Sequence, residues 1–249
     1  MKSQSRPQSF CRRGNPFLSV GLACLIVTLW AASLVDACTV HLSDTSWLLT
    51  IVRVLVRAFL HTGLFIVTHE AIHHNISQNP WINDVFGYTT SFLYAVLPYR
   101  VLARNHRLHH QFPGTEKDPD HSISGFLLWY FQFMKSYQVG WQVWISLAGI
   151  SFGFSILTAL QIPFANLILF WILPMVASSL QLFTFGIFLP HRKTEEGYRD
   201  SHAAQSIGLP VVLSFITCYH FGYHWEHHQY PYLPWYRLPQ AYWQARAEL

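Results

Sequence analysis

The sequence predicts an all-α integral membrane protein with four transmembrane helices, a re-entrant or interfacial helix and a histidine-rich cytoplasmic cap. Composition is the first reason: 51% of the 249 residues are hydrophobic and only 11% are charged, whereas about a quarter are charged in soluble domains. The second is a set of apolar stretches long enough to cross a bilayer. The third is that fifteen histidines outnumber twelve carboxylates. We expect residues 1–249 to form a single domain, with the cap built from 69–121 and 191–249.

The first two predicted spans are residues 16–36 and 47–67. The first is long and apolar enough to cross a bilayer. A cleavable signal peptide is the alternative, but the cleavage site at 35–37 is poor, and we favour a retained helix. The second span contains Arg53 and Arg57. Because charged side chains are costly in lipid, we expect both to snorkel to the interface or to face protein.

The middle of the chain is expected to approach the membrane without crossing it and then to form a helical hairpin. Residues 85–102 are apolar but short, with Pro98 near the end, which predicts a re-entrant or interfacial piece. The aromatic residues of 126–142 are typical of the membrane interface. Two further spans are predicted at about 143–160 and 164–190, and their short connection makes them a hairpin.

The distribution of basic residues predicts the topology. If 85–102 does not cross, four crossings place the N-terminus and all the histidine-rich segments on one side, whereas a crossing there would divide them between two sides. The two loops on the opposite side contain no Lys or Arg. The positive-inside rule therefore places the histidines at the cytoplasmic face. The basic residues on that side are Lys2, Arg6, Arg12, Arg13, Arg100, Arg104, Arg107, Lys117, Arg192, Lys193 and Arg199.

Three short segments, or boxes, carry histidines at the spacing of metal ligands. Residues three or four apart share one face of a helix, so each box would aim at least two ring nitrogens at one point. Neutral imidazole is a common ligand of iron, copper, nickel and zinc. We expect the boxes to converge on a centre that holds more than one ion. The boxes contain His69 and His73, then His106, His109 and His110, and finally His224, His227 and His228.

Other interpretations exist for the boxes taken singly. A lone H-x-x-H on an apolar helix is more often a core histidine than a ligand, but three boxes would each need a separate structural role. The first box also matches the zinc-protease signature H-E-x-x-H, with Glu70 as general base. An intramembrane zinc protease would leave the other two boxes without a role. A metal transporter is disfavoured because the histidines cluster at one face, and the chain has no basic run that would indicate nucleic-acid binding.

Taken together, the boxes resemble those of the membrane fatty-acid desaturase and hydroxylase superfamily, whose H-x-x-x-H and H-x-x-H-H boxes surround a non-haem di-iron centre. Within it the chain resembles the bacterial and cyanobacterial type of β-carotene ketolase. The similar segments are 182–192, 217–228, 234–239 and Asp118-Pro119-Asp120. The sequence departs from this branch at Glu70, where Asp is usual, and at His74, Gly222 and Trp225.

The resemblance implies a set of metal ligands and their neighbours. It carries the eight box histidines over as ligands of two iron ions and adds His191 as an isolated ninth ligand. His220, one turn before His224 by count, would be a ligand or a hydrogen-bonding neighbour of one. Residues Glu70, Asp118 and Glu226 would orient ligand imidazoles by accepting their second N–H, unless they are only solvated or salt-paired. Hydrogen bonding is the default role for His74 and His202, and His41, His61 and His121 are expected to be structural.

The resemblance also implies the chemistry. A ketolase of this type uses O2 to hydroxylate carbon 4 of a β-ionone ring twice, which converts β-carotene to echinenone and canthaxanthin. The chain has no glycine-rich dinucleotide motif, and its scattered cysteines (Cys11, Cys24, Cys38 and Cys218) form no cluster, so an external, ferredoxin-type electron donor is expected. A fatty-acyl desaturase or hydroxylase, or a carotenoid hydroxylase, is the alternative within the superfamily.

Overall fold

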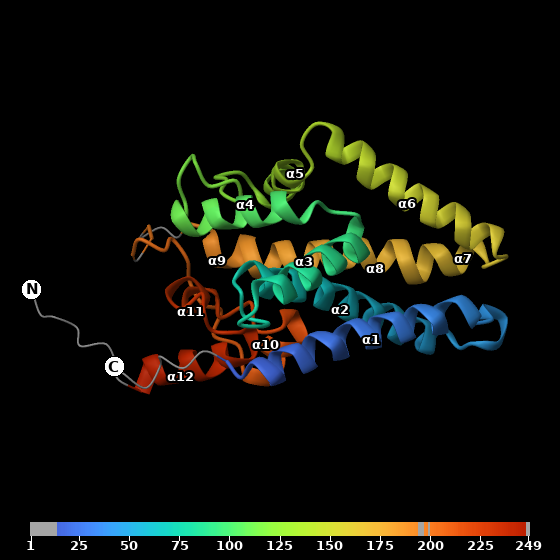
Figure 1. The fold of residues 1–249 in the computed structure, drawn as a ribbon, viewed down its shortest axis with the longest axis horizontal. Helices are drawn as coiled ribbons and strands as arrows, with labels where there is room; N and C mark the ends of the chain where they lie inside the picture. Colours follow the sequence, from blue (N-terminus) through green and yellow to red (C-terminus); the bar gives the residue numbers. More distant parts are fainter. Residues whose placement is uncertain (1–13, 194–196, 199, 248–249) are drawn as a thin grey trace, which may run out of the picture.

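The computed structural model describes residues 14–193, 197–198 and 200–247. Over these residues the chain is mainly helical, and its long helices run roughly side by side (Figure 1). The α-helices are α1 (Pro16–Thr39), α2 (Trp47–Ile72), α3 (Pro80–Ala95), α4 (Tyr99–Gln111), α5 (Phe126–Tyr137), α6 (Trp141–Ala159), α7 (Phe164–Leu167), α8 (Leu173–Leu182), α9 (Leu189–His191), α10 (Val211–Cys218), α11 (His224–Gln229) and α12 (Leu238–Ala247).

Four helical segments are long and apolar enough to cross a membrane: Pro16–Thr39, Trp47–Ile72, Trp141–Ala159 and Phe164–His191. Each of the four predicted spans therefore corresponds to one of these helical segments, with shifted ends. The largest shift is in α2, which continues to Ile72 instead of ending near residue 67. His69 consequently lies inside the last turn of this helix, and the helix axis fixes the direction of its side chain.

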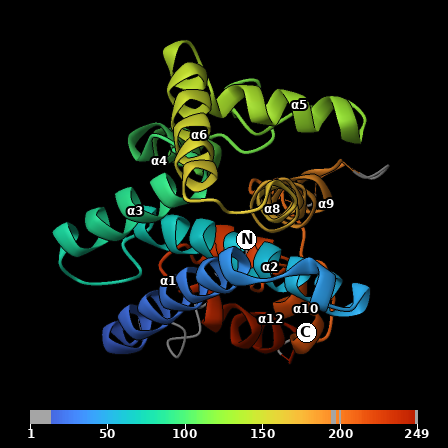
Figure 2. The same ribbon diagram turned by 90° about the vertical axis from the view of Figure 1, so that its right-hand side faces the viewer.

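Helix α2 is the centre of the bundle, in contact with α1, α3 and α8 (Figure 2). Its buried side chains Leu64, Ile66 and Val67 belong to the same core as Ala23 and Ile26 of α1. The first span is thus part of the folded core. Helix α6, in contrast, stands apart from α1 and α2 and leaves all its apolar residues at least partly exposed, which suits a helix surrounded by lipid.

The segment expected to form one re-entrant or interfacial helix at 85–102 is two helices. Helix α3 begins earlier, at Pro80, and ends at Ala95, and α4 begins at Tyr99. Val96 between them has a left-handed conformation with φ 54°. Pro98, which lacks a backbone N–H and disfavours helical conformation in the preceding residue, occupies the N-cap of α4. The break lets α4 run along its own direction, and this helix carries the second histidine box.

The last span contains two π-helical segments, Ile168–Ile172 and Phe183–Phe188. The first lies beside Pro174, which has no N–H to donate to the carbonyl of Phe170 four residues earlier. Arg57 of α2 takes that place: its Nε donates to the Phe170 carbonyl at 2.8 Å, and its Nη1 donates to the Trp30 carbonyl at 3.1 Å. The guanidinium is buried and faces protein, as predicted for this span. Arg53 pairs with Asp36 at 3.1 Å.

Replacing Arg57 with methionine should lower the Tm of the detergent-solubilised protein, because the Phe170 carbonyl would lose its donor. An unsatisfied buried carbonyl costs about 1–3 kcal/mol. Pro174→Ala restores a backbone N–H, so the same Arg57→Met change should cost less Tm in that background. Arg53→Met, which breaks a partly exposed ion pair, is the matched control with a small expected effect. If Arg57→Met lowers the Tm equally in the wild-type and the Pro174→Ala backgrounds, this account is contradicted.

Candidate metal centre

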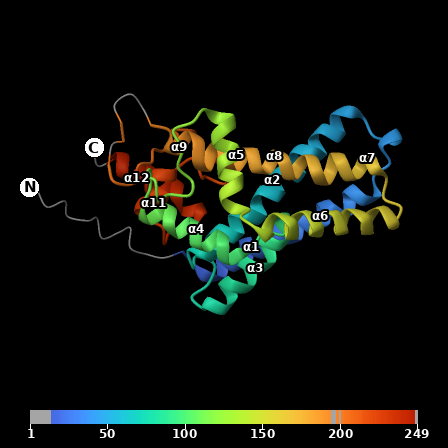
Figure 3. The ribbon, with the colours of Figure 1, turned by 90° about the horizontal axis from the view of Figure 1, so that it is seen from above.

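The helices bring all three histidine boxes to one end of the bundle. Seen from above, α4, α9 and α11 gather at the end opposite the α6–α7 turn (Figure 3). Box one lies at the C-terminal end of α2, box two in the second half of α4, and box three makes up most of α11. His191 is the last residue of α9. Segments far apart in the sequence thus contribute side chains to one buried site.

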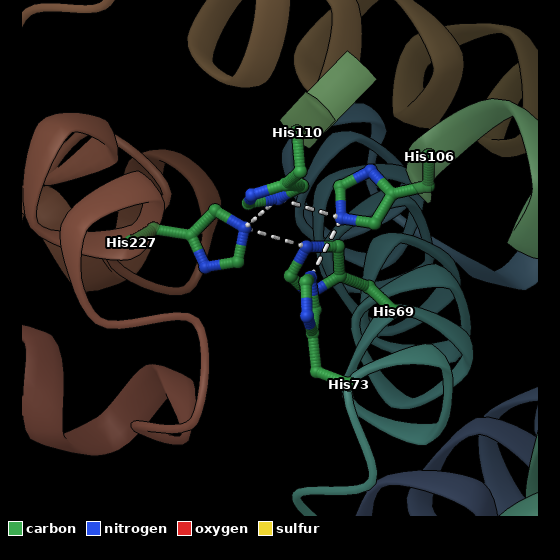
Figure 4. A group of neighbouring side chains, drawn as sticks. All are labelled: His69, His73, His106, His110 and His227. Carbon is green, nitrogen blue, oxygen red and sulfur yellow. Dashed lines mark hydrogen bonds between the residues drawn. The ribbon is translucent and has the colours of Figure 1, made fainter. Parts of the chain in front are cut away.

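The first histidine group has five members whose ligand nitrogens all lie within 4.8 Å of one another. Their Nε2 atoms point toward one centre (Figure 4). The shortest separations are 2.7 Å from His73 to His106, 2.9 Å from His110 to His227 and 3.1 Å from His69 to His227. The members of group one are His69, His73, His106, His110 and His227.

The second group has four members, again with all ligand nitrogens within 4.8 Å. The Nε2 atom of His228 is 3.1 Å from that of His109 and 3.2 Å from that of His224. The groups are neighbours, because the ring centroids of His110 in group one and His228 in group two are 4.3 Å apart. The members of group two are His109, His191, His224 and His228.

Each H-x-x-H-H box supplies both groups. Histidines four apart share a group: His106 with His110 in group one, and His224 with His228 in group two. The histidine three residues after the first one of each box belongs to the other group: His109 to group two and His227 to group one. Adjacent helical residues are about 100° apart around the axis. The double histidine at the end of each box therefore aims one ring at each group, which holds the two groups side by side.

Hydrogen bonds outside the groups fix several ring tautomers. His109 Nδ1 donates to Asp118 at 2.9 Å, and Asp118 also accepts from the Gly114 backbone at 2.9 Å. His191 Nδ1 donates to the carbonyl of Ala203 at 2.8 Å. In such rings Nε2 carries a lone pair and faces the group. His69 Nδ1 lies 3.3 Å from Glu70, so Asp118 and Glu70 each contact the Nδ1 side of a box histidine.

Glu226 does not share this arrangement among the described residues. Its carboxylate accepts a short hydrogen bond from Ser206 and lies 3.7 Å from Arg246. On the short helix α11 it lies between His224 and His227 in sequence but on a different face. Its contacts are those of a buried, salt-paired carboxylate. Burial raises the pKa of Glu226 and outweighs Ser206 and Arg246, which lower it.

The surroundings keep the imidazoles in the form that binds metals. Burial, followed by the neighbouring imidazoles, lowers the pKa of His73, His106, His110, His224, His227 and His228 well below the ordinary value. These rings are therefore neutral near pH 7. His109 differs: burial lowers its pKa, but the hydrogen bond to Asp118 and the charge of Asp120 outweigh this and raise it overall.

The donor set fits two metal ions. Bonds from imidazole nitrogen to such ions are about 2.0–2.1 Å, so nitrogens around one ion lie about 3–4 Å apart, similar to the separations within each group. His191 gives an independent indication, since its Nε2 is buried and has no hydrogen-bond partner among the described residues. A ring of lone pairs facing one another is otherwise unfavourable, and a cation at each centre would stabilise it.

His220 lies in neither group. Its ring is buried against Tyr223 and Trp235, with ring centroids 5.9 and 6.0 Å away. His220 does not continue the helix of His224, because Tyr219 and His220 have left-handed φ values of 46° and 66°. The chain therefore turns sharply between α10 and α11. Burial lowers the pKa of His220 to about 4.

The remaining histidines also lie outside both groups. His202 contacts Gln229 through Nε2 at 2.9 Å, and its ring centroid is 6.3 Å from that of His228. His61 is buried in α2 and accepts from Trp30 at 3.2 Å. His74 is exposed and has a left-handed φ of 56°.

An apolar cavity opens beside the two groups, and Asp120 lines it. The histidines at its wall come from both groups: His69 and His106 from one, His109 and His224 from the other. From the sequence, Asp120 was noted only as part of the segment Asp118-Pro119-Asp120, and no role was predicted for it. Burial raises its pKa to about 6. The apolar wall comprises Phe65, Phe133, Leu182, Gly186, Ile187 and Phe221.

A bundle of apolar helices with paired all-histidine groups at one end defines the chain as a membrane protein of the histidine-box class. The family model for fatty acid desaturases matches residues 45–147 and 127–249. The chain therefore belongs to the fatty acid desaturase family.

Comparison with individual relatives shows which members of this family the chain resembles over most of its length. The chain is 34% identical over 232 residues to a β-carotene ketolase from Paracoccus sp. (strain PC1), covering 92% of this chain and 93% of the relative. It is 38% identical over 210 residues to β-carotene 4-ketolase 3 from Haematococcus lacustris, covering 80% of this chain and 64% of that relative. An sn-1 acyl-lipid omega-3 desaturase (ferredoxin) from Nostoc sp. (strain 36) matches only 28% of this chain, at 31% identity. The resemblance to β-carotene ketolases is thus confirmed over most of the chain.

Proposed function

We propose that the protein is an O2-dependent, non-haem di-iron oxygenase that introduces a 4-keto group into β-ionone rings, converting β-carotene to echinenone and canthaxanthin. The observation that carries this proposal is the pair of adjacent histidine groups at the wall of one apolar cavity. The similarity to a β-carotene ketolase over 92% of the chain supports the substrate. Group one would hold one iron ion and group two the other.

Bound at these groups, the two ions would supply the activation of O2 needed to attack the allylic C–H bond at carbon 4 of the ring. The protein's own residues hold the imidazoles and exclude water. Asp118 and the Ala203 carbonyl hold His109 and His191 by their Nδ1–H groups. Phe65, Phe133 and Phe221 keep the cavity beside them apolar.

The overall reaction consists of two hydroxylations at the same carbon. Each inserts one oxygen atom of O2 into a C–H bond and reduces the other to water, which consumes two electrons and two protons. The geminal diol formed by the second hydroxylation loses water to give the ketone. The electrons would come from outside the chain, and a ferredoxin-type protein is the proposed donor, in keeping with the similarity to an omega-3 desaturase whose name specifies ferredoxin.

A continuous run of apolar residues supports a path for a long polyene. The cavity at the histidines shares Phe65, Phe133, Tyr137 and Leu182 with a second apolar cavity. That second cavity shares Leu97 with an open hollow on α3 and the start of α4. A carotenoid would pass from lipid through this hollow, past Leu97, and bring one ring to the histidines.

The alternatives receive less support. A fatty-acyl desaturase or hydroxylase, or a carotenoid hydroxylase, would use the same histidine groups, but the acyl-lipid relative matches only 28% of the chain. A zinc protease would need the carboxylate of Glu70 as a base near the metal. Glu70 instead accepts from the backbone of Trp235 at 3.3 Å and lies beside Nδ1 of His69, on the side of that ring opposite its Nε2.

We further propose four crossings with the metal centre at the cytoplasmic face. The α1–α2 loop and the α6–α7 turn lie together at the end opposite the histidines (Figure 1), and neither contains Lys or Arg. Of the basic residues on the predicted cytoplasmic side, Lys2, Arg6, Arg12, Arg13 and Arg199 lie outside the described residues.

In a cysteine-free background, cysteines at Thr45 and Gln161 should be labelled from one side and cysteines at Lys117 and Arg192 from the other. Labelling of all four from one side would contradict this topology.

Pigment analysis of cells that make β-carotene tests the proposed activity. Expression of the full chain should produce echinenone and canthaxanthin, and the protein purified without oxygen should contain two iron ions per chain. Imidazole sites can take up zinc during overexpression, so metal content and activity should be measured on the same preparation. Acyl-lipid products without ketocarotenoids, or one zinc and no iron in active protein, would exclude the proposal.

A further inference from the structure

The cavity beside the histidines is lined by one buried carboxylate, which lies near His109 and Asp118 but belongs to neither histidine group. Asp120 is only 3% exposed. Its Oδ2 accepts from the hydroxyl of Tyr137 at 3.0 Å, whereas its Oδ1 is buried without a hydrogen-bond partner among the described residues. A buried acceptor without a donor is unfavourable. Such a group in the wall of a cavity indicates a ligand that brings its own donor.

The carboxylate of Asp120 is held in a fixed position. Its backbone N–H donates to Asp118 at 2.9 Å, and its carbonyl accepts from Trp129 Nε1 at 2.7 Å. Tyr137, itself 9% exposed, holds Oδ2 from helix α5. The nearest imidazole nitrogen, Nδ1 of His109, is 3.8 Å from Oδ2 and is already donating to Asp118. Oδ1 is thus the oxygen of this cavity-lining residue that has no donor among the described residues.

The chemistry of the cavity limits what that ligand is. Among the described residues that line it, the groups other than imidazoles, Asp120 and Tyr137 are apolar or glycine. A hydrocarbon ring would occupy the apolar part of the cavity and leave Oδ1 without a hydrogen-bond donor. A hydroxyl group on that ring would donate to Oδ1 and avoid being desolvated without a partner.

We propose that Asp120, positioned by Tyr137, binds the hydroxyl group that the first hydroxylation places on the substrate ring. The inference rests on the proposed function, in which the 4-hydroxy compound must stay bound or rebind for a second hydroxylation at the same carbon. The hydrogen bond to Oδ1 holds the alcohol with its remaining C–H toward the histidines. β-Carotene itself has no hydroxyl, so Asp120 favours the second step over the first.

The test is the ratio of 4-keto to 4-hydroxy products. The chain would be expressed in cells that make β-carotene. In a second assay, membranes containing the chain would be supplied either with β-carotene or with its 4-hydroxy derivative. Asp120→Leu removes the acceptor and should lower the keto-to-hydroxy ratio about tenfold, as expected for loss of a hydrogen bond to a charged group. Asp120→Asn keeps a polar partner and should lower the ratio less. Tyr137→Phe, which frees the carboxylate without removing it, should shift the ratio in the same direction.

The controls separate this role from folding and from metal binding. Tyr130→Phe removes a hydroxyl from the same helix, where it contacts Ser179 at 2.7 Å outside the cavity, and should keep the wild-type ratio. An unchanged ratio in Asp120→Leu and Tyr137→Phe would overturn the inference and leave the proposed function intact. Loss of iron in proportion to activity would also overturn it, because Asp120 would then act on the metal groups. Absence of both products from the wild-type chain would instead overturn the proposed function.

Discussion

Replacing His191 with alanine should abolish ketone formation and lower the iron content from two ions per chain toward one. His191 is one of four histidines in group two, its Nδ1 is held by the Ala203 carbonyl, and its buried Nε2 has no partner among the described residues. The variant removes a ligand and leaves group two with three imidazoles. Group one lacks His191 and should keep its ion.

His202→Ala is the matched control for this prediction. His202 lies near group two, with its ring centroid 6.3 Å from that of His228, but it contacts Gln229 and belongs to neither group. Its loss should have a mild effect on yield and none on iron. His220→Ala should likewise keep both ions. Ketocarotenoid yield per unit of folded protein, measured with iron in the same samples, decides the matter. A His191→Ala protein with near-normal yield and two ions would remove His191 from the ligand set.

The number and approximate positions of the spans could be predicted because hydrophobic length follows directly from bilayer thickness. The division of 85–102 into two helices could not, because α3 begins in a polar stretch before the apolar run and ends in a left-handed residue at Val96. The π-helical segments of the last span could not be predicted from the local sequence either. The first of them packs on Arg57, a residue more than a hundred positions earlier in the chain.

The convergence of the boxes could be predicted from helical spacing. Their division into two groups was also predictable, from the double histidine at the end of each H-x-x-H-H box. The double histidines place neighbouring rings about 100° apart, so each doublet must face two points. The position of His220 could not be predicted, because counting one turn back from His224 assumes a continuous helix, and residues 219–220 break it. Asp120 stands in a loop without periodicity, and only the packing of α5 against that loop reveals its cavity position.

Substitution at Gly186 should separate access to the cavity from metal binding. Gly186 lies in the second π-helical segment and lines the cavity with histidines of both groups. A Cβ at this position would be 3.3 Å from Cδ2 of Phe221, so alanine requires only a small shift of that ring. A leucine side chain would occupy the cavity itself. Because Gly186 provides no ligand atom, neither change should remove a metal ion.

We therefore expect Gly186→Leu to lower ketocarotenoid yield on the order of a hundredfold, since displacing a reacting carbon by about an ångström can cost that much, while iron stays at two ions per chain. Gly186→Ala should retain most of the yield. Gly21→Leu is the matched control, because Gly21 lies on the exposed face of α1 with nothing within 4 Å of an added Cβ. Yield and iron are measured together for all three variants. If Gly186→Leu makes ketone at the rate of Gly21→Leu, the substrate ring reaches the histidines by a route other than this cavity.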